Sequence, residues 1–341
     1  MTVVKATFTV GEKGVVTVAQ EQAEMVFADE HYGDPGESST RYESDFAPEK
    51  RFVDVLVNGH VYAPGGGKNV PQCQAALRVG RLSKILRVSG RRFWTQGIRV
   101  GASSPKPLDK VALMYENAFG GVDTSHSAQR HQGAELRNPV GCGYRKSPKD
   151  GDAMGHPVPQ LEYASDSPIA FKKPKAPASF GVVGRGWQPR IAFAGTYDAA
   201  WLEHTAPFLP RDFDMRYFQT APLDQQLPSL PPGTMVQLAH LTPNGAFTFL
   251  IPEVTIPVVY RFADREERPT MMMDTLIIEP DASRFMMTWR CKVALGRKIA
   301  DLKEVKVGEP AITSDKPRTR NGKPYFRSLA ELVRWRKGGG R

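Results

Sequence analysis

The sequence lacks the features that mark membrane-spanning and disulfide-stapled proteins. No apolar run approaches the ~20 residues that a membrane helix requires. The first residues, MTVVKATFTV, are interrupted by Lys5 and three threonines, so we expect no signal peptide, no membrane association and a cytoplasmic location. The three cysteines, Cys73, Cys142 and Cys291, are odd in number and far apart, which predicts buried thiols in a reducing compartment.

Motifs for metal and phosphate binding are also missing. The chain has no C-x-x-C, and the spacing of His126 and His131 does not fit H-E-x-x-H. Cys142 and His156 follow at irregular distances, so we interpret the four as residues scattered through a loop region and not as a metal site. In YAPGGGKN (62–69) both ends depart from the P-loop pattern, and a glycine-rich turn is sufficient to explain it. We therefore expect no metal and no cofactor.

Motifs for catalytic nucleophiles are absent too, so paired carboxylates are the remaining candidates for catalytic residues. There is no G-x-S-x-G, and none of the seven histidines has a local partner that suggests a triad. Asp212 and Asp214 in PRDFD would share one face of an extended strand roughly 7 Å apart, not far from the separation of a glycosidase pair. A D-x-D beside Pro210 is equally typical of turn-capping aspartates, and we favour that structural interpretation.

The segment FQTAPLDQQLPSLPPG (218–233) combines polar side chains with fixed backbone. Pro222 restricts its own φ and disfavours a helix at Ala221. Asp224 can accept backbone N–H bonds two residues further on and so stabilise a tight reversal. Gln225 cannot titrate, so it can position a ligand but cannot act as an acid or base. We predict a rigid corner without catalysis, which could carry recognition.

The net charge of +10 is unevenly distributed. Residues 297–341 contain 13 Lys/Arg against 5 Asp/Glu, or +8, whereas residues 1–50 contain 4 against 10, or −6. No aromatic residues are interleaved with the basic ones in a stacking pattern, so nucleic acid is an unlikely partner. The basic extension favours contact with an acidic surface.

The dominant periodicity along the chain is two, which predicts strands. Apolar residues alternate over 4–10, 53–57, 73–79 and 285–295, and Pro243-Asn244-Gly245 supplies a hairpin turn. We predict a mainly β fold of antiparallel sheets in sandwich-like lobes, with few short helices.

Two segments have helical patterns, at residues 108–119 and after the S-x-x-E capping box of Ser328 to Glu331. The predicted organisation is an N-terminal β-rich lobe (1–119), a Gly/Pro-rich connecting region packed on the sheets (120–190), a C-terminal β-rich lobe (191–300) and a basic extension with a short helix (301–341).

A series of motifs in order resembles the DUF 2169 family over nearly the whole chain. They are VVKATFTV (3–10), RYESDFAPEK (41–50), VDVLVNGHVYAPGGG (53–67), LRVGRLSKILRVSGRRFW (77–94), YENAFGG (115–121), NPVGCGY (138–144), GRGWQPRIAFAGTYDAAW (184–201), LPRDFDMRYFQTAPLDQQ (209–226), DTLIIEP (274–280) and MTWRC (287–291). The resemblance implies a cytosolic, non-enzymatic adaptor or chaperone of bacterial type VI secretion, which binds an effector and promotes its loading onto the VgrG spike or its PAAR tip.

An adaptor needs exposed aromatic and arginine anchors on a rigid scaffold. The candidates are Trp187, Arg190, Trp201 and Trp335, besides the scaffold residues of the corner and of PRDFD. Two other hypotheses stay open. One is a carbohydrate-active or other hydrolytic enzyme that uses Asp212, Asp214 and Asp224, and the other is polyanion binding through residues 297–341.

Overall fold

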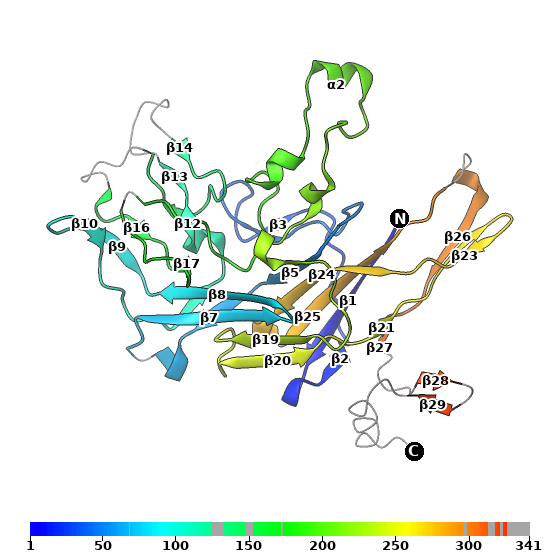
Figure 1. Cartoon of the computed structure of the whole chain (residues 1–341), viewed down its shortest axis with the longest axis horizontal. Coiled ribbons are helices and arrows are strands. Elements are labelled where there is room, and N and C mark those ends of the chain that lie inside the picture. Colours follow the sequence, from blue (N-terminus) through cyan, green and yellow to red (C-terminus); the bar gives the residue numbers. More distant parts are fainter. Residues whose placement is uncertain are drawn as a thin grey trace.

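The computed structural model describes residues 1–67, 69–123, 133–146, 153–171, 173–295, 299–312, 318–320 and 323–325. Over these residues the chain forms several, mainly antiparallel, sheets and no closed barrel, which confirms the mainly β prediction (Figure 1). The α-helix α2 (Ala199–His204) has six residues. No helix in these ranges is long and apolar enough to cross a membrane. The predicted C-terminal helix and Trp335 lie outside the described residues.

The larger sheet joins strands from both ends of the chain. Its order is β18 (Gln226–Leu227), β5 (Val53–Val57), β24 (Met272–Glu279), β25 (Arg284–Cys291), β1 (Thr2–Val10) and β2 (Val16–Val18). β1 and β25 pair in antiparallel register from Thr2 opposite Cys291 to Thr9 opposite Arg284. β5 and β24 are parallel. The turn η1 (Glu12–Gly14) leads β1 back into β2.

The second sheet is a five-stranded antiparallel sheet. Its order is β17 (Leu161–Tyr163), β8 (Leu82–Ser89), β7 (Gln72–Val79), β19 (Met235–Ala239) and β20 (Ala246–Leu250). β19 and β20 pair from Met235 opposite Leu250 to Ala239 opposite Ala246, which confirms the predicted hairpin. Gly245 adopts the left-handed φ of +83° that this turn requires.

The two sheets pack face to face around an aromatic stack. Phe285 on β25 stacks on Phe8 of β1, with ring centroids 5.1 Å apart, and on Phe249 of β20 at 4.5 Å. Leu77 and Val236 of the second sheet belong to the same buried cluster. Removal of these side chains from water is the main favourable contribution to folding. Strands of the predicted lobes 1–119 and 191–300 therefore share both sheets and one core.

The outer face of the larger sheet is buried as well, which the alternation in sequence did not predict. Leu56, Ile277 and Met286 on this face form a second apolar cluster with Val182 and Ala221.

The buried guanidinium of Arg290 is held on the same face by segment 20–52. Arg290 donates to the carbonyls of Asp45 and Ala47, at 2.6 and 3.0 Å, and pairs with Asp274. The outer face of β5, β24 and β25 is thus covered by chain that is distant in sequence.

The prediction of a helix over 108–119 is wrong. The segment contains β11 (Lys110–Ala112), a 3-10 turn η3 (Tyr115–Asn117) and β12 (Phe119–Gly120). Burial alternates with a period of two, because Val111, Leu113 and Tyr115 are buried and their neighbours are less so. β11 pairs with β6 (His60–Tyr62), so tertiary pairing overrides the ambiguous local pattern.

Short strands make up the rest of the described chain. Around residues 92–163 they are β9 (Arg92–Gln96), β10 (Val100–Ala102), β13 (Val122–Asp123), β14 (Gly133–Ala134), β15 (Cys142–Gly143) and β16 (Pro157–Val158). Elsewhere they are β3 (Glu30–His31), β4 (Thr40–Tyr42), β21 (Val254–Thr255), β22 (Val258–Phe262), β23 (Glu266–Glu267), β26 (Leu302–Val307), β27 (Ala311–Ile312), β28 (Arg318–Arg320) and β29 (Lys323–Tyr325). Additional 3-10 turns are η2 (Pro64–Gly67), η8 (Pro280–Ala282) and η9 (Ile299–Asp301).

Two segments project from the packed sheets (Figure 1). One is the ribbon of β22, β23 and β26. The other carries α2 and rises beside the pocket described below, so it is the projection that matters for the site.

We expect Phe285→Ala to lower the free energy of unfolding by about 3–5 kcal/mol, because it leaves a cavity between the two sheets. Urea denaturation of both proteins measures the difference. The matched control is Phe27→Ala, since Phe27 is 78% exposed and its loss should cost less than about 0.5 kcal/mol. Equal effects of the two substitutions would contradict the proposed core.

Candidate binding site

The corner (residues 218–226) is fixed to the larger sheet by one buried carboxylate, Asp54 on β5. Gln219 donates its amide N–H to Asp54 Oδ1 at 2.9 Å. Thr220 donates its backbone N–H and its hydroxyl to Oδ2 at 2.8 and 3.0 Å, and the Ala221 N–H reaches Oδ1 at 3.2 Å. Lys50 Nζ lies 2.8 Å from Oδ2. Asp54 is 0% exposed, so these groups replace water around the charge.

The pKa of Asp54 lies below its ordinary value. Burial alone would raise it, but the charge of Lys50 and the hydrogen bonds from Lys50, Thr220 and Gln219 together outweigh desolvation. The carboxylate is therefore ionised in the folded protein at neutral pH and serves as a structural anchor.

A second anchor holds the distal half of the corner. Gln225 is fully buried in the 3-10 turn η7 (Leu223–Gln225), and its amide donates to the carbonyls of Val55 and Phe180 at 2.6 and 3.0 Å. Its side-chain oxygen accepts from Lys84 Nζ at 2.7 Å. The predicted rigid corner is thus present, and the carboxamide is part of its scaffold.

Lys84 on β8 links this scaffold to Asp224. The ammonium lies 3.0 Å from Asp224 Oδ1, and 5.0 Å from the centre of the Tyr163 ring. Burial lowers the pKa of Lys84 to about 8, although the Asp224 carboxylate counteracts part of this effect. The side chain of Asp224 is 42% exposed and lines the pocket that is described next.

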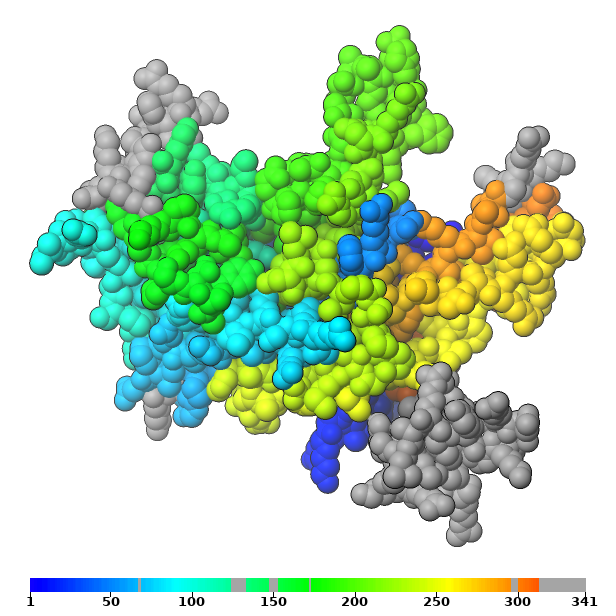
Figure 2. All heavy atoms as spheres, viewed as in Figure 1, coloured from blue at the N-terminus to red at the C-terminus, as the bar shows by residue number. Residues whose placement is uncertain are grey.

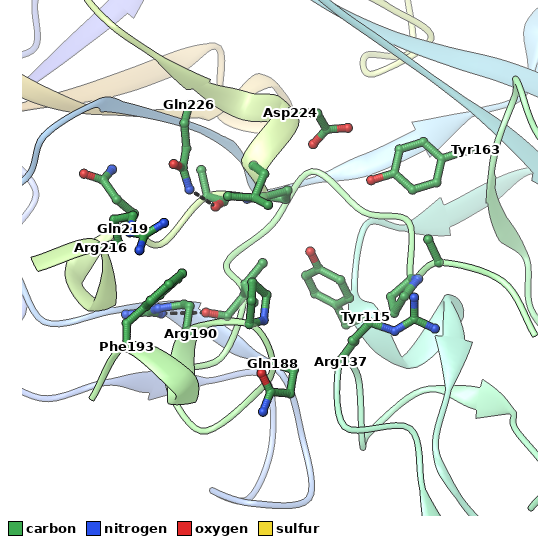
Figure 3. Close-up of a pocket in the computed structure, with 17 residues that line it drawn as sticks. Tyr115, Arg137, Tyr163, Gln188, Arg190, Phe193, Arg216, Gln219, Asp224 and Gln226 are labelled. Carbon is green, nitrogen blue, oxygen red and sulfur yellow. Dashed lines mark hydrogen bonds between the residues drawn. The ribbon is translucent and has the colours of Figure 1, made fainter. Parts of the chain in front are cut away.

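A pocket of about 290 Å³ lies between the corner, residues 176–193 and the 3-10 turn η6 (Met215–Phe218) (Figure 3). Its wall is largely apolar. The apolar lining residues are Ala176, Pro177, Val183, Pro189, Phe193, Ala221, Pro222 and Leu223. This volume is at the small end of the roughly 300–1,000 Å³ typical of ligand pockets, so it suits one large side chain or a short peptide stretch.

Three polar groups face the interior of the pocket: Tyr115, Tyr163 and Asp224 (Figure 3). Burial raises the pKa of Tyr163, and the negative charge of the nearby Asp224 adds to this shift. Burial also raises the pKa of Tyr115, with smaller contributions from Tyr163 and Asp224. Both phenols are therefore protonated at neutral pH and are hydrogen-bond donors.

The three arginines around the pocket are paired with carboxylates. Arg190 binds Glu43 through two contacts of 2.6 and 2.8 Å. Arg137 lies 2.7 Å from Glu135, and Arg216 lies 2.7 Å from Asp214. Because Asp224 is paired with Lys84, the charges around the pocket balance.

The projecting segment of residues 194–213, here called the arm, begins and ends beside this pocket. The Asp214 N–H donates to the Phe193 carbonyl at 3.0 Å, which joins η5 (Arg190–Phe193) to η6. Asp212 accepts the N–H and the hydroxyl of Thr196 at 3.0 and 2.8 Å. These bonds close the base of the arm.

The arm has a small interior of its own. Trp201 on α2 donates its indole N–H to the Phe208 carbonyl at 2.9 Å, and the Tyr197 ring packs edge-on at 4.7 Å. Asp198 caps α2 by accepting the Trp201 N–H. Outside this interior the apolar side chains are exposed, with Leu202 at 68% and Phe208 at 75%. Figure 2 shows the arm standing away from the body of the molecule.

The structure brings only some of the predicted residues together. Arg190, Pro222 and Asp224 line the pocket, and Gln225 lies behind it. Trp187 is buried and packs edge-on against Tyr115 at 5.3 Å.

The aspartates of PRDFD do not form a strand face as the enzymatic hypothesis requires. Asp212 braces the arm, and Asp214 is the N-cap of η6, where its side chain accepts from the Arg216 N–H at 2.9 Å. Neither residue lines the pocket that holds Asp224. Hydrogen bonds from Thr196 lower the pKa of Asp212, and those from Arg216 lower that of Asp214. The turn-capping interpretation is confirmed.

Sequence reasoning missed Asp54, Lys84, Tyr115 and Tyr163. An aspartate within the apolar run VDVLV was the available signal, because a charge in a strand that becomes fully buried needs partners. Of the residues considered as metal ligands, His126 and His131 lie outside the described residues. No group of three His, Cys, Asp or Glu side chains suited to a metal occurs in the part that is described.

A family model described as "Uncharacterized protein conserved in bacteria (DUF2169)" matches residues 1–290. This range includes the pocket, the corner and the arm. The chain belongs to the DUF2169 family. Comparisons with curated proteins and with solved structures found no match.

In this DUF2169 protein we expect Asp54→Ala to lower the free energy of unfolding by about 3–5 kcal/mol, because Lys50 is left buried without its partner. Since the folded pKa is depressed, the contribution is present above pH about 4 and is lost as the pH falls through the folded pKa. The difference between the two proteins, measured by urea denaturation, should therefore shrink in acid.

The control for this experiment is Asp264→Ala, whose side chain is 75% exposed and which should cost less than about 0.5 kcal/mol. A cost for Asp54→Ala as small as that of the control would rule out Asp54 as the anchor.

We expect Lys84→Met to reveal the titration of the buried amine. The folded pKa of about 8 is below the ordinary 10.5, so the unfolded chain binds more protons between these values and wild-type stability rises with pH. Relative to Lys84→Met, the wild type should gain up to about 3 kcal/mol between pH 8 and pH 10.5, at about 1.4 kcal/mol for each pKa unit. Denaturation at several pH values measures it. Lys306→Met replaces an exposed lysine, so the difference in stability between this variant and the wild type should not change with pH. If the difference in stability between Lys84→Met and the wild type is also independent of pH, the lowered pKa of Lys84 is refuted.

Proposed function

We propose that this protein is a non-enzymatic cytoplasmic adaptor that binds a type VI secretion effector and promotes its loading onto the VgrG spike or its PAAR tip. Membership of the DUF2169 family supports the proposal through the resemblance described above. The arm is the observation that carries it, because large apolar side chains are held in solvent on a braced projection.

Exposed apolar side chains that cluster on one element are characteristic of protein-binding surfaces. On the arm and its base they are Ile191, Tyr197, Leu202, Phe208 and Leu209. The fold does not use these side chains for its own core. In the free protein these apolar side chains are in contact with water, which is unfavourable. A partner that covers them would remove them from water, and this burial would contribute favourably to the free energy of binding.

The pocket and the arm together form one surface, which we call the arm–pocket surface: the arm, the corner and the residues that line the pocket. Hydrogen bonds at the base of the arm and around Asp54 hold its parts in fixed positions. A pre-organised surface loses less conformational entropy on binding, which favours affinity.

The enzymatic alternative gains no support from the positions of its carboxylates, since Asp212 and Asp214 brace the arm outside the pocket that contains Asp224. Most of the basic extension lies outside the described residues, and polyanion binding stays a prediction of the sequence.

We expect the double substitution Leu202→Asp and Phe208→Asp to weaken effector and spike binding without unfolding the protein. Both side chains are exposed, so the free energy of unfolding should change by less than about 0.5 kcal/mol for each. Loss of two anchors should weaken binding by about 2 kcal/mol or more, roughly 30-fold. The measurement is co-purification of tagged protein with the effector, VgrG and PAAR proteins encoded beside it, followed by titration calorimetry.

The matched control is Ile98→Asp, which places the same charge at a fully exposed apolar position on the β9–β10 loop. Binding should be unchanged in this variant. Failure of the wild-type protein to retain any neighbouring effector or spike protein would overturn the proposed function, and equal loss in the control would remove the arm as its site.

A further inference from the structure

The Tyr115 hydroxyl faces the pocket interior and has no hydrogen-bond partner among the described residues. Tyr115 is only 4% exposed, its ring packs against Trp187, and its backbone carbonyl accepts from Asn138 at 2.8 Å. The hydroxyl makes no hydrogen bond with any residue that the structure describes. It points into the pocket (Figure 3). The hydroxyl is therefore a donor that a ligand in the pocket can use.

The opposite side of the same space offers an acceptor. Asp224 accepts from Lys84, yet its side chain remains 42% exposed. An ionised carboxylate has about four lone-pair sites, so it can accept a further N–H from a ligand. One donor and one acceptor facing the same small volume match the carbonyl and the N–H of a peptide backbone.

Charge also restricts the class of ligand. The four ion pairs around the pocket, Asp224–Lys84, Arg190–Glu43, Arg137–Glu135 and Arg216–Asp214, leave no unbalanced charge. A charged ligand group would have to break one of these pairs and would itself lose hydration. An uncharged apolar group would instead be covered by the proline and aliphatic wall.

We propose that the pocket receives an uncharged, apolar segment of the partner protein in extended conformation, with one main-chain carbonyl accepting from Tyr115 and one N–H donating to Asp224. This inference rests on the proposed adaptor function and deepens it. The arm covers one side of the partner, and the pocket at the base of the arm selects a short sequence within it. Proline or leucine fits the wall, whereas an acidic or basic side chain does not.

The first test uses phage-displayed random short peptides as the probe, selected against the full-length protein. We expect enriched peptides to be uncharged and to contain a large apolar residue or proline. A synthetic copy of an enriched peptide should bind Tyr115→Phe about two- to tenfold more weakly than wild type, the effect of one lost hydrogen bond. The melting temperature should not fall, because the hydroxyl has no partner within the described protein.

Ala176→Trp provides a second variant that fills the mouth of the pocket. Ala176 is exposed and lines the pocket, so the substitution should leave the fold intact and reduce peptide binding at least tenfold. The matched controls are Ala263→Trp, on the exposed β22–β23 turn, and Tyr62→Phe, whose hydroxyl bonds Asp281 away from the pocket. Both controls should bind the peptide as the wild type does.

Several outcomes would overturn the inference: no enriched peptide, a charged consensus, or peptide binding that Tyr115→Phe and Ala176→Trp leave unchanged. The proposed adaptor function is tested separately, by co-purification with the effector and spike proteins. If the arm variant loses those partners while Ala176→Trp retains them with unchanged affinity, the pocket inference fails and the adaptor function stands. If wild-type protein binds the peptide but neither effector nor spike, the proposed function fails on its own.

Discussion

The ionised carboxylate of Asp54 is the constraint on which the site depends. It is fully buried on a central strand, and its oxygens are bonded by Lys50, Gln219, Thr220 and Ala221. These bonds fix the start of the corner at one point of the larger sheet. The corner then forms one wall of the pocket and continues from η6, where the arm ends. Burying this charge is costly, but it attaches the corner to the sheet, because its partners Gln219, Thr220 and Ala221 lie 165 to 167 residues away in the sequence.

The double burial of the larger sheet explains how the molecule can keep an apolar arm in solvent. One face packs on the second sheet through Phe8, Phe249 and Phe285, and the other is covered by segment 20–52 and the corner. No residue of the arm belongs to the buried core clusters of the described chain, and its small interior around Trp201 is separate from them. Apolar side chains that contribute nothing to the core are free to contribute to binding.

Local patterns predicted the strands well and the site only in part. The alternation over residues 285–291 predicts β25, and the Pro243-Asn244-Gly245 turn predicts the β19–β20 hairpin. Each of these signals is contained within a few consecutive residues. The alternation around Asp54 also predicts its strand, but not that chain from 219–221 covers its polar face. Residues 108–119 have an ambiguous period, and only pairing with β6 makes them extended. The pocket is lined by Tyr115, Tyr163 and Asp224, which come from three distant segments of the chain. No local sequence pattern predicts that these residues lie close together.

The polar groups of the pocket are held in fixed positions by their neighbours. Lys84 donates to Asp224, so the position of this carboxylate is set before any ligand arrives. Gln225 holds Lys84 from behind and is itself bonded to two backbone carbonyls, so the charge pair cannot rearrange without breaking the corner. Tyr115 supplies a donor on the other side, within a wall of prolines whose backbone is already restricted. Fixed donors, fixed acceptors and balanced charge select a ligand by its shape and its backbone, which is the requirement for reading a short neutral stretch of another protein.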